Sequence, residues 1–209
     1  MQRVGLFVLF LAACGDDGGS KVNIIDSGMT VDSPPVSVDC KASSAYGTVT
    51  PTTQDAYSGE FDGDPNLWIF LDLNTDPTPD ILLVDLYSGY GAFENGFPTA
   101  GASIQLTGDE VHPASCGACV SIQVDYTENG PADDYYLADG GTLNLTSATP
   151  TSLAGNLSNV TFKHMNIDDS GLATPHPDGC TATLTSLAFS ATPTADTFAK
   201  PRFSKRARR

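Results

Sequence analysis

Four of the five cysteines lie in the body of the chain, and their number and spacing predict disulfide chemistry. An even number of cysteines in an exported chain is typical of two disulfides. Cys40 precedes the first expected strand and Cys180 begins the last. We therefore favour a Cys40–Cys180 bond that joins the ends of the domain, with Cys116 bonded to Cys119. The alternative, in which the Cys116–Cys119 turn is bonded to both ends, stays open.

The pair Cys116-Gly-Ala-Cys119 also has the spacing of a redox dithiol. A redox cysteine usually lies at a helix N-terminus, which lowers the pKa of its thiol. Here the pair leads directly into an expected strand that begins at Val120. The sequence therefore favours a structural disulfide in a loop over a redox centre.

Two histidines stand in similar sequences before a cysteine, His112-Pro-Ala-Ser-Cys116 and His176-Pro-Asp-Gly-Cys180. Histidine and cysteine are common zinc ligands, but a zinc–thiolate site needs reduced thiols, which are rare outside the cytosol. We therefore favour ordinary turns as the explanation of the similarity between these two short sequences. The ligands of the zinc alternative would be His112, Cys116, Cys119, His176 and Cys180.

Two acidic loops, residues 62–66 and 72–80, alternate oxygen-bearing side chains as calcium-binding loops do. The second loop opens with the Asp-x-Asn-x-Asp of an EF-hand loop. It then departs from that pattern, because Pro77 replaces the turn glycine and Leu83 replaces the bidentate glutamate. We favour a solvated hairpin turn over a calcium site. The candidate calcium ligands are Asp72, Asn74, Asp76 and Asp80.

The segments that must position these residues are short apolar runs separated by Gly, Pro, Asn and Asp, which is typical of strands. Residues 67–73 and 81–87 are apolar on both faces, and the turn-rich residues 74–80 between them predict a hairpin. Residues 157–167 change phase near Asn159, which predicts a bulge or two strands, and residues 181–190 show a similar slip near Thr185 and Ser186. Further strands are expected at residues 102–107, 120–126 and 142–146.

The fold class follows from the number and spacing of these runs. No segment shows a helical stripe of useful length, and turns recur about every 8–12 residues, which is typical of a sandwich. We expect an all-β protein, an antiparallel β-sandwich with jelly-roll or immunoglobulin-like connections and disulfide links.

The N-terminus begins with a positive charge at Arg3, continues with an apolar run and ends in small residues before Cys14. This order is the layout of a secretory signal, and the run is too short to span a bilayer. Leu11-Ala-Ala-Cys14 resembles the lipobox of bacterial lipoproteins, and the chain resembles small uncharacterised surface or outer-membrane lipoproteins of Gram-negative bacteria. The resemblance implies that Cys14 is lipidated and anchors the chain in a membrane. An ordinary cleaved signal with a chance cysteine is the alternative.

The same resemblance bears on localisation. In that family an aspartate directly after the lipidated cysteine often means retention in the inner membrane. Gly15 occupies this position here, so the outer membrane or the cell surface is favoured.

The composition divides the chain into four parts. Residues 1–13 are the expected signal peptide, and residues 14–38, rich in Gly, Ser, Asp and Pro, are expected to be the lipidated cysteine and a flexible tether. Residues 39–199 form the expected β-domain. Residues 200–209 carry six positive charges and no negative charge, which predicts a disordered basic tail. We expect this tail to be a free end, with contact to anionic lipid or to the acidic body as the alternative.

The net charge of −15 bears on the choice of partner. Between Cys40 and Ala199, Lys41 and Lys163 are the only lysines or arginines. Because phosphate binding needs a basic patch, the β-domain is not expected to bind nucleic acid.

No catalytic signature is present, neither Gly-x-Ser-x-Gly, nor His-Glu-x-x-His, nor a phosphate-binding loop. We expect a non-catalytic binding or cell-envelope structural module with a protein or glycan partner, and no cofactor apart from the calcium alternative. The second hypothesis is a glycan-active enzyme or carbohydrate-binding module that uses exposed aromatic rings. The run around Trp68 predicts a core position for that ring. The candidate rings are Trp68, Tyr87, Tyr90, Tyr135 and Tyr136.

Overall fold

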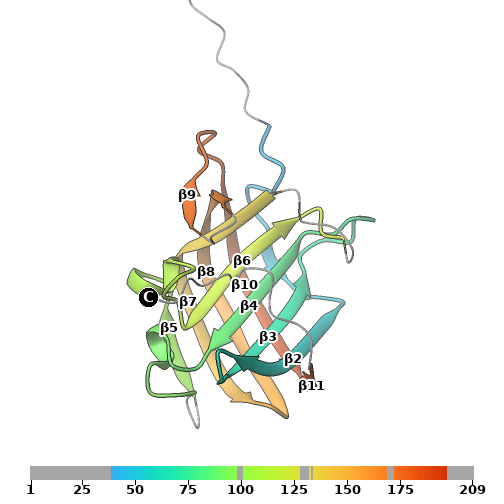
Figure 1. Cartoon of the computed structure of the whole chain (residues 1–209). Helices are drawn as coiled ribbons and strands as arrows, with labels where there is room; N and C mark the ends of the chain where they lie inside the picture. The colour runs from blue at the N-terminus through green and yellow to red at the C-terminus, as the bar shows by residue number, and fades with distance from the viewer. Residues whose placement is uncertain (1–38, 98–100, 128–131, 133, 169–171, 197–209) are drawn as a thin grey trace, which may run out of the picture. The chain divides into compact units, whose positions relative to one another are not determined.

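The computed structural model describes residues 39–97, 101–127, 132, 134–168 and 172–196. These residues form one mixed β-sheet of 11 strands (Figure 1). The described part also contains two short 3-10 helices, η1 (Gly91–Phe93) and η2 (Gly108–Val111). The strands are β1 (Gly47–Val49), β2 (Gln54–Phe61), β3 (Asp64–Asp72), β4 (Ile81–Tyr87), β5 (Ala102–Gln105), β6 (Ala118–Val124), β7 (Asp134–Thr149), β8 (Ser152–Ile167), β9 (Ala173–Pro175), β10 (Thr181–Ala191) and β11 (Thr194–Ala195).

The backbone of the sheet is an antiparallel meander in the order β2-β3-β4-β6-β7-β8-β10. β1 pairs in parallel with β10, and β11 pairs in parallel with β2. Neighbouring strands of a meander run in opposite directions. The C-terminal ends of β3, β6 and β8 therefore lie beside the N-terminal ends of β4, β7 and β10, along one side of the sheet where strands begin and end. We call this row of strand ends the upper rim, and it lies at the top of Figure 1.

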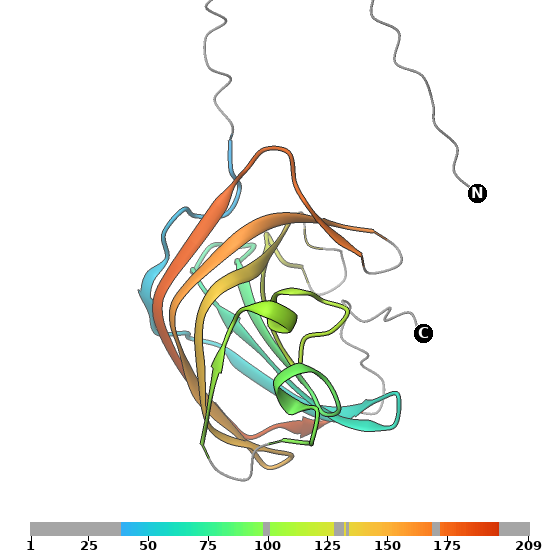
Figure 2. The same ribbon diagram turned by 90° about the vertical axis from the view of Figure 1, so that its left-hand side faces the viewer.

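The expectation of an all-β protein is confirmed for the described residues. The two-sheet sandwich is not confirmed, because all the strands belong to one hydrogen-bonded sheet. Figure 2 shows that this sheet curls, so that β7, β8 and β10 face β3 and β4 across the core. One sheet therefore provides the two facing layers that we expected from two sheets.

The curl has a local cause in β8 and β10. The core-facing residues of β8 change phase between Leu157 and Val160, and the intervening Asn159 has a positive φ of 50°. Those of β10 change phase between Leu184 and Leu187. Both phase changes were predicted, and since they lie side by side in the sheet they bend neighbouring strands at one place.

β7 bends at the same place through Gly140 and Gly141. Gly141 has a φ of 110°, and a Cβ there would lie 2.6 Å from the Cα of Val160, so only glycine fits. The pairing with β8 shifts register on both sides of Gly140. The sequence predicts a strand only from residue 142, because Asp139-Gly-Gly is typical of a turn; the structure continues the strand through this bulge.

The concave face of the sheet holds the hydrophobic core. In β4, which matches the predicted run at residues 81–87, Leu82, Val84 and Leu86 point into the core and are fully buried. The predicted hairpin at residues 74–80 joins β3 to β4, with the amide of Leu73 donating to the carbonyl of Asp80 at 2.8 Å. Alternation along the strands therefore separates the core residues from those on the convex face, which we call the outer face.

Both disulfides have the pairing that the sequence analysis favoured. Cys40 is bonded to Cys180 with a Cα–Cα distance of 5.7 Å, and Cys116 is bonded to Cys119 with a Cα–Cα distance of 5.3 Å. The first bond fits the parallel pairing of β1 with β10, which brings the beginning and the end of the domain together. The Cys40–Cys180 bond lies at the upper rim, where β10 begins.

Candidate metal centre

Four polar residues from three segments meet inside the upper rim. Asp134 is the first residue of β7, and His164 lies near the end of β8. His176 and Asp178 lie in the turn between β9 and β10. Neighbouring strands bring these residues together, because Tyr136, two residues after Asp134 on the same face of β7, pairs directly with His164 in β8.

The turn that carries His176 and Asp178 has a simple sequence basis. The amide of Gly179 donates to the carbonyl of His176 at 3.3 Å, which closes the tight turn His176-Pro-Asp-Gly179. Proline at the second position and glycine at the fourth are typical of such turns. The amide of His176 donates to the carbonyl of His164, and the amide of His164 donates to the carbonyl of Cys180. The turn is thereby fixed against β8, beside the Cys40–Cys180 disulfide.

Two imidazole nitrogens converge on one carboxylate oxygen. Nδ1 of His164 lies 2.6 Å from Oδ2 of Asp178, and Nδ1 of His176 lies 2.9 Å from the same oxygen. The ligand atoms that His164, His176 and Asp178 offer all lie within 4.8 Å of one another. This is the only such group of at least three metal-ligating side chains among the residues that the structure describes.

His164 is held on both sides. Its Nε2 lies 3.1 Å from Oδ1 of Asp134, so each ring nitrogen faces a carboxylate. A carboxylate accepts hydrogen bonds only, so both contacts are hydrogen bonds when His164 carries a proton on each nitrogen. The side chain of His164 is 6% exposed, whereas that of His176 is 32% exposed. The cluster therefore has a buried, fixed histidine and a more accessible one.

Ring stacking also fixes the position of His164. The ring of Tyr136 stacks on one side of it with 4.7 Å between the centroids, and the ring of His176 lies 4.1 Å away. Tyr136 is fully buried, and its hydroxyl has no hydrogen-bond partner in the described part of the chain. Burial raises the pKa of this phenol. His164 thus cannot rotate away from the two carboxylates without disturbing the core.

The charge of Asp178 is stabilised by its surroundings. Burial would raise the pKa of this carboxyl group, but the hydrogen bonds from the amide of Cys180 and from His164 and His176 outweigh it and hold the pKa below its ordinary value. The distance from the Cys180 nitrogen to Oδ1 of Asp178 is 2.9 Å. The carboxyl group of Asp178 is therefore anionic at neutral pH.

The cysteines of the zinc alternative are not available as ligands. Cys116, Cys119 and Cys180 all form disulfides, and disulfide sulfur does not act as the thiolate that zinc binds. His176 lies beside His164 and Asp178, while His112 is exposed in the segment before Cys116. The alternative thus identified one of the clustered residues, His176, but with the wrong partners.

The carboxylates of the predicted calcium loop bind protein groups instead of converging. Asp72 accepts hydrogen bonds from the Thr52 hydroxyl and from the amide of Thr53. Asp80 accepts from the Tyr46 hydroxyl at 2.7 Å and from the amide nitrogen of the Asn74 side chain at 3.1 Å. These bonds tie the hairpin to the chain around β1. Calcium binding by Asp72, Asn74, Asp76 and Asp80 stays a prediction.

The acidic loop at residues 62–66 has a structural explanation. Asp62 and Gly63 both have positive φ angles, of 55° and 93°, and form the two-residue turn between β2 and β3. Asn66 lies within β3 and donates to Asp85 at 2.7 Å.

The aromatic residues of the glycan hypothesis are mostly buried. Trp68 and Tyr87 are each 2% exposed, and Tyr136 is fully buried. Tyr90 and Tyr135 are half-buried. A carbohydrate-binding surface needs exposed rings, so this set does not provide one.

Sequence reasoning missed His164, Asp134 and Asp178. One signal was present, because Val160, Phe162 and His164 alternate on the core-facing side of an expected strand. A histidine at a core-facing position needs a polar partner, so this alternation could have identified His164 as a candidate site residue. The partners themselves depend on the register between β7, β8 and the β9–β10 turn.

Comparison with known proteins adds no relative: no family model, no curated protein and no solved structure matches this chain. Among the described residues, no helix is long and apolar enough to cross a membrane. Cys14 and the basic residues 200–209 lie outside the described residues.

Proposed function

We propose that this chain is an exported, lipid-anchored and non-catalytic binding protein whose β-domain binds a divalent transition-metal ion. Zinc is the ion that the residues fit best. The ligands are His164, His176 and Asp178, and Asp134 orients His164. The observation that carries the proposal is the convergence of two imidazole nitrogens on one carboxylate oxygen, at 2.6 Å and 2.9 Å.

The types of ligand favour zinc over calcium. Imidazole nitrogen suits zinc, copper, nickel and iron, whereas calcium takes oxygen ligands. Zinc is not redox-active and is often bound by three protein ligands plus water. Two histidines and one aspartate provide such a set without thiols. That set is compatible with an oxidising compartment, which the two disulfides also favour.

The surroundings resemble the outer shell of a metal site. A histidine that binds a metal usually donates its other ring nitrogen to a carboxylate, which fixes the ring and raises its basicity. Nε2 of His164 faces Asp134 in this way. With Nε2 bound to Asp134, Nδ1 is the nitrogen that faces His176 and Asp178. A bound metal ion would be held by Nδ1 of His164, Nδ1 of His176 and a carboxylate oxygen of Asp178, in place of the protons of the hydrogen bonds among these groups.

The experiment is thermal unfolding with and without zinc, after treatment with a chelator. A ligand that binds only the folded state stabilises it by about 2.7 kcal/mol at 100 times Kd, which is about 5–10 °C in Tm for a domain of this size. We expect that shift for the wild type and a much smaller one for His176→Ala. His112→Ala is the matched control, because His112 is exposed and outside the cluster.

Two results would contradict the proposal. One is the absence of a zinc-dependent shift in the wild type. The other is an equal shift in the His176→Ala variant. A larger shift with millimolar calcium than with zinc would favour the hairpin at residues 72–80 over the cluster.

A further inference from the structure

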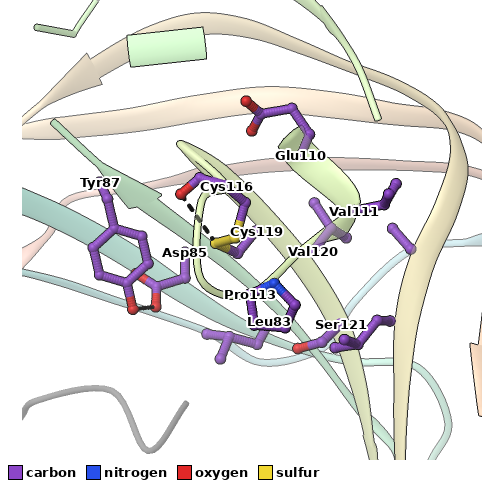
Figure 3. A pocket seen from close by; sticks show the side chains of 12 residues that line it. Leu83, Asp85, Tyr87, Glu110, Val111, Pro113, Cys116, Cys119, Val120 and Ser121 are labelled. Carbon is purple, nitrogen blue, oxygen red and sulfur yellow. Dashed lines mark hydrogen bonds between the residues drawn. A yellow bond between two sulfur atoms is a disulfide. The ribbon is translucent and has the colours of Figure 1, made fainter. Parts of the chain in front are cut away.

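A small pocket lies on the outer face of the sheet (Figure 3). Its floor comes from outward-facing residues of β4, β6 and β7, and one wall comes from the segment around η2. Figure 3 shows the Cys116–Cys119 disulfide and Pro113 at this wall. The main apolar lining residues are Leu83, Val111, Pro113 and Leu137.

Two carboxylates line this pocket, Asp85 and Glu110, and Glu110 accepts hydrogen bonds from the amides of Ala92 and Ala118. Asp85 lines the pocket and is only 2% exposed. It accepts hydrogen bonds from the Asn66 side chain at 2.7 Å and from the Tyr87 hydroxyl. A carboxylate within an apolar surface fits a side chain with an apolar stem and a cationic head, as in arginine or lysine.

The described chain ends on this same face. The amide of Asp196 donates to the carbonyl of Ser58 in β2 at 2.9 Å. A Cβ on Gly59 would lie 3.2 Å from the Asp196 carbonyl oxygen and 3.2 Å from the Trp68 ring, which is on the outer face. Glycine at position 59 therefore leaves room for the chain to pass over β2 beside Trp68.

The sequence that follows has the right length and charge. Residues 197–209 carry six positive charges and two phenylalanines, Phe198 and Phe203. An extended segment of this length reaches about 40 Å, while the three strand spacings from β2 to β6 are about 15 Å in total. The domain to which it would bind has Lys41 and Lys163 as its only lysines or arginines, and Lys163 pairs with Asp139 at 2.7 Å.

We propose that residues 197–209 bind across the outer face of their own domain and place a basic side chain in the pocket beside Asp85. The surface is thus an intramolecular docking site for a cationic, aromatic peptide. This inference is independent of the metal centre, which lies at the upper rim.

The experiment is limited chymotrypsin cleavage after Phe203, followed by mass spectrometry of the full chain. A bound segment is cleaved only when it opens, so docking slows the cleavage. We expect cleavage of the wild type to be at least about tenfold slower than that of a variant whose six Lys and Arg residues in the tail are replaced by Gln. Chymotrypsin can also prefer one of the two tail sequences for itself. The cleavage rates of free peptides of residues 197–209, one with each sequence, are therefore used to correct the rates measured on the full chains.

Variants of the pocket test where the tail binds. Asp85→Asn is expected to accelerate the cleavage, and Asp109→Asn is the matched control because it removes one exposed carboxylate outside the pocket. Thermal unfolding of the Asp85→Asn and Asp109→Asn variants shows whether their domains are intact. The tail variant has no substitution within the β-domain. High salt is expected to accelerate wild-type cleavage as well.

Equal corrected rates for the wild type and the Gln variant would overturn the proposal. So would protection that is seen only after addition of phosphatidylglycerol vesicles, because the partner of the tail would then be an anionic membrane. Equal acceleration by Asp85→Asn and Asp109→Asn, with the Gln variant also fast, would show general attraction to the acidic domain and would overturn the assignment to the pocket.

Discussion

At the scale of single residues, the arrangement depends on a histidine that contacts two carboxylates. His164 is 6% exposed and lies between Asp134 and Asp178, with Tyr136 stacked on its ring. A buried polar side chain without partners would cost free energy, and both ring nitrogens of His164 have partners. The same contacts hold the ring in the orientation that a metal ligand needs.

Asp178 makes the stability of the metal-free protein depend on pH. Its pKa is lower in the folded protein than the ordinary value of 3.8, because the hydrogen bonds from Cys180, His164 and His176 outweigh the effect of burial. A lowered carboxyl pKa stabilises the folded state above the unfolded pKa, and this stabilisation is lost as the pH falls through the folded pKa. We expect the difference in unfolding free energy between wild type and Asp178→Asn to shrink as the pH falls below 3.8.

Urea unfolding in the presence of a chelator, at a series of pH values, measures this difference. A difference that stays constant down to the lowest pH at which the wild type still folds would mean that Asp178 has an unperturbed carboxyl group.

At the scale of elements, the short apolar runs of the sequence were enough to predict the central strands. The apolar run at residues 81–87 coincides with β4, and the phase changes near Asn159 and Thr185 were visible as breaks in the period of two. The first half of β7 was missed because Asp139-Gly-Gly is locally typical of a turn. Only the pairing with β8 shows that Gly141 is in a bulge, where its missing side chain makes room for Val160.

The sequence could not predict how the sheet closes on itself. Local patterns show which face of a strand is apolar, and a sandwich and a curled sheet need the same alternation. The difference is set by bulges that coincide in β7, β8 and β10, and such coincidence is a property of register. The same limit applies to the candidate metal centre, because register places Asp134 and Asp178 on either side of His164.

The two disulfides differ in what they hold together. Cys40–Cys180 joins residues 140 apart and connects the segment before β1 to the start of β10, whereas Cys116–Cys119 closes a loop with a separation of 3. By the chain-entropy model the long bond contributes about 4–5 kcal/mol, and the short bond contributes much less. We expect Cys40→Ser with Cys180→Ser to lower the free energy of unfolding far more than Cys116→Ser with Cys119→Ser.

Denaturant unfolding of the two double variants compares these contributions, with the oxidised wild type as reference. A larger loss for the Cys116 and Cys119 pair would contradict the expectation. It would mean that the loop beside η2 determines the stability of the domain.

At the scale of the whole molecule, the proposed lipid anchor and the acidic domain have separate tasks. Leu11-Ala-Ala-Cys14 resembles a lipobox, and residues 14–38 have the composition of a tether. A domain with a net negative charge attracts cations and repels anionic surfaces. We propose that the anchor keeps the domain at a membrane while the upper rim binds metal ions.

The anchor is tested by Cys14→Ser. Without the sulfur no diacylglycerol is attached, and the several acyl chains that hold a lipoprotein are lost. We expect the variant in soluble fractions and the wild type in membrane fractions after cell lysis and centrifugation. If the variant still partitions with membranes, the lipobox interpretation is wrong.

The central claim is that zinc binds to nitrogen and oxygen ligands of the cluster at the upper rim. The most direct measurement is zinc X-ray absorption of the purified full chain after removal of loosely bound metal. The account predicts about one zinc per chain, with nitrogen and oxygen ligands at about 2.0–2.2 Å, an outer-shell signature of two imidazoles and no sulfur at about 2.3 Å. His176→Ala should remove one imidazole from this signature. A protein that retains no zinc, or a zinc bound by sulfur, would contradict it.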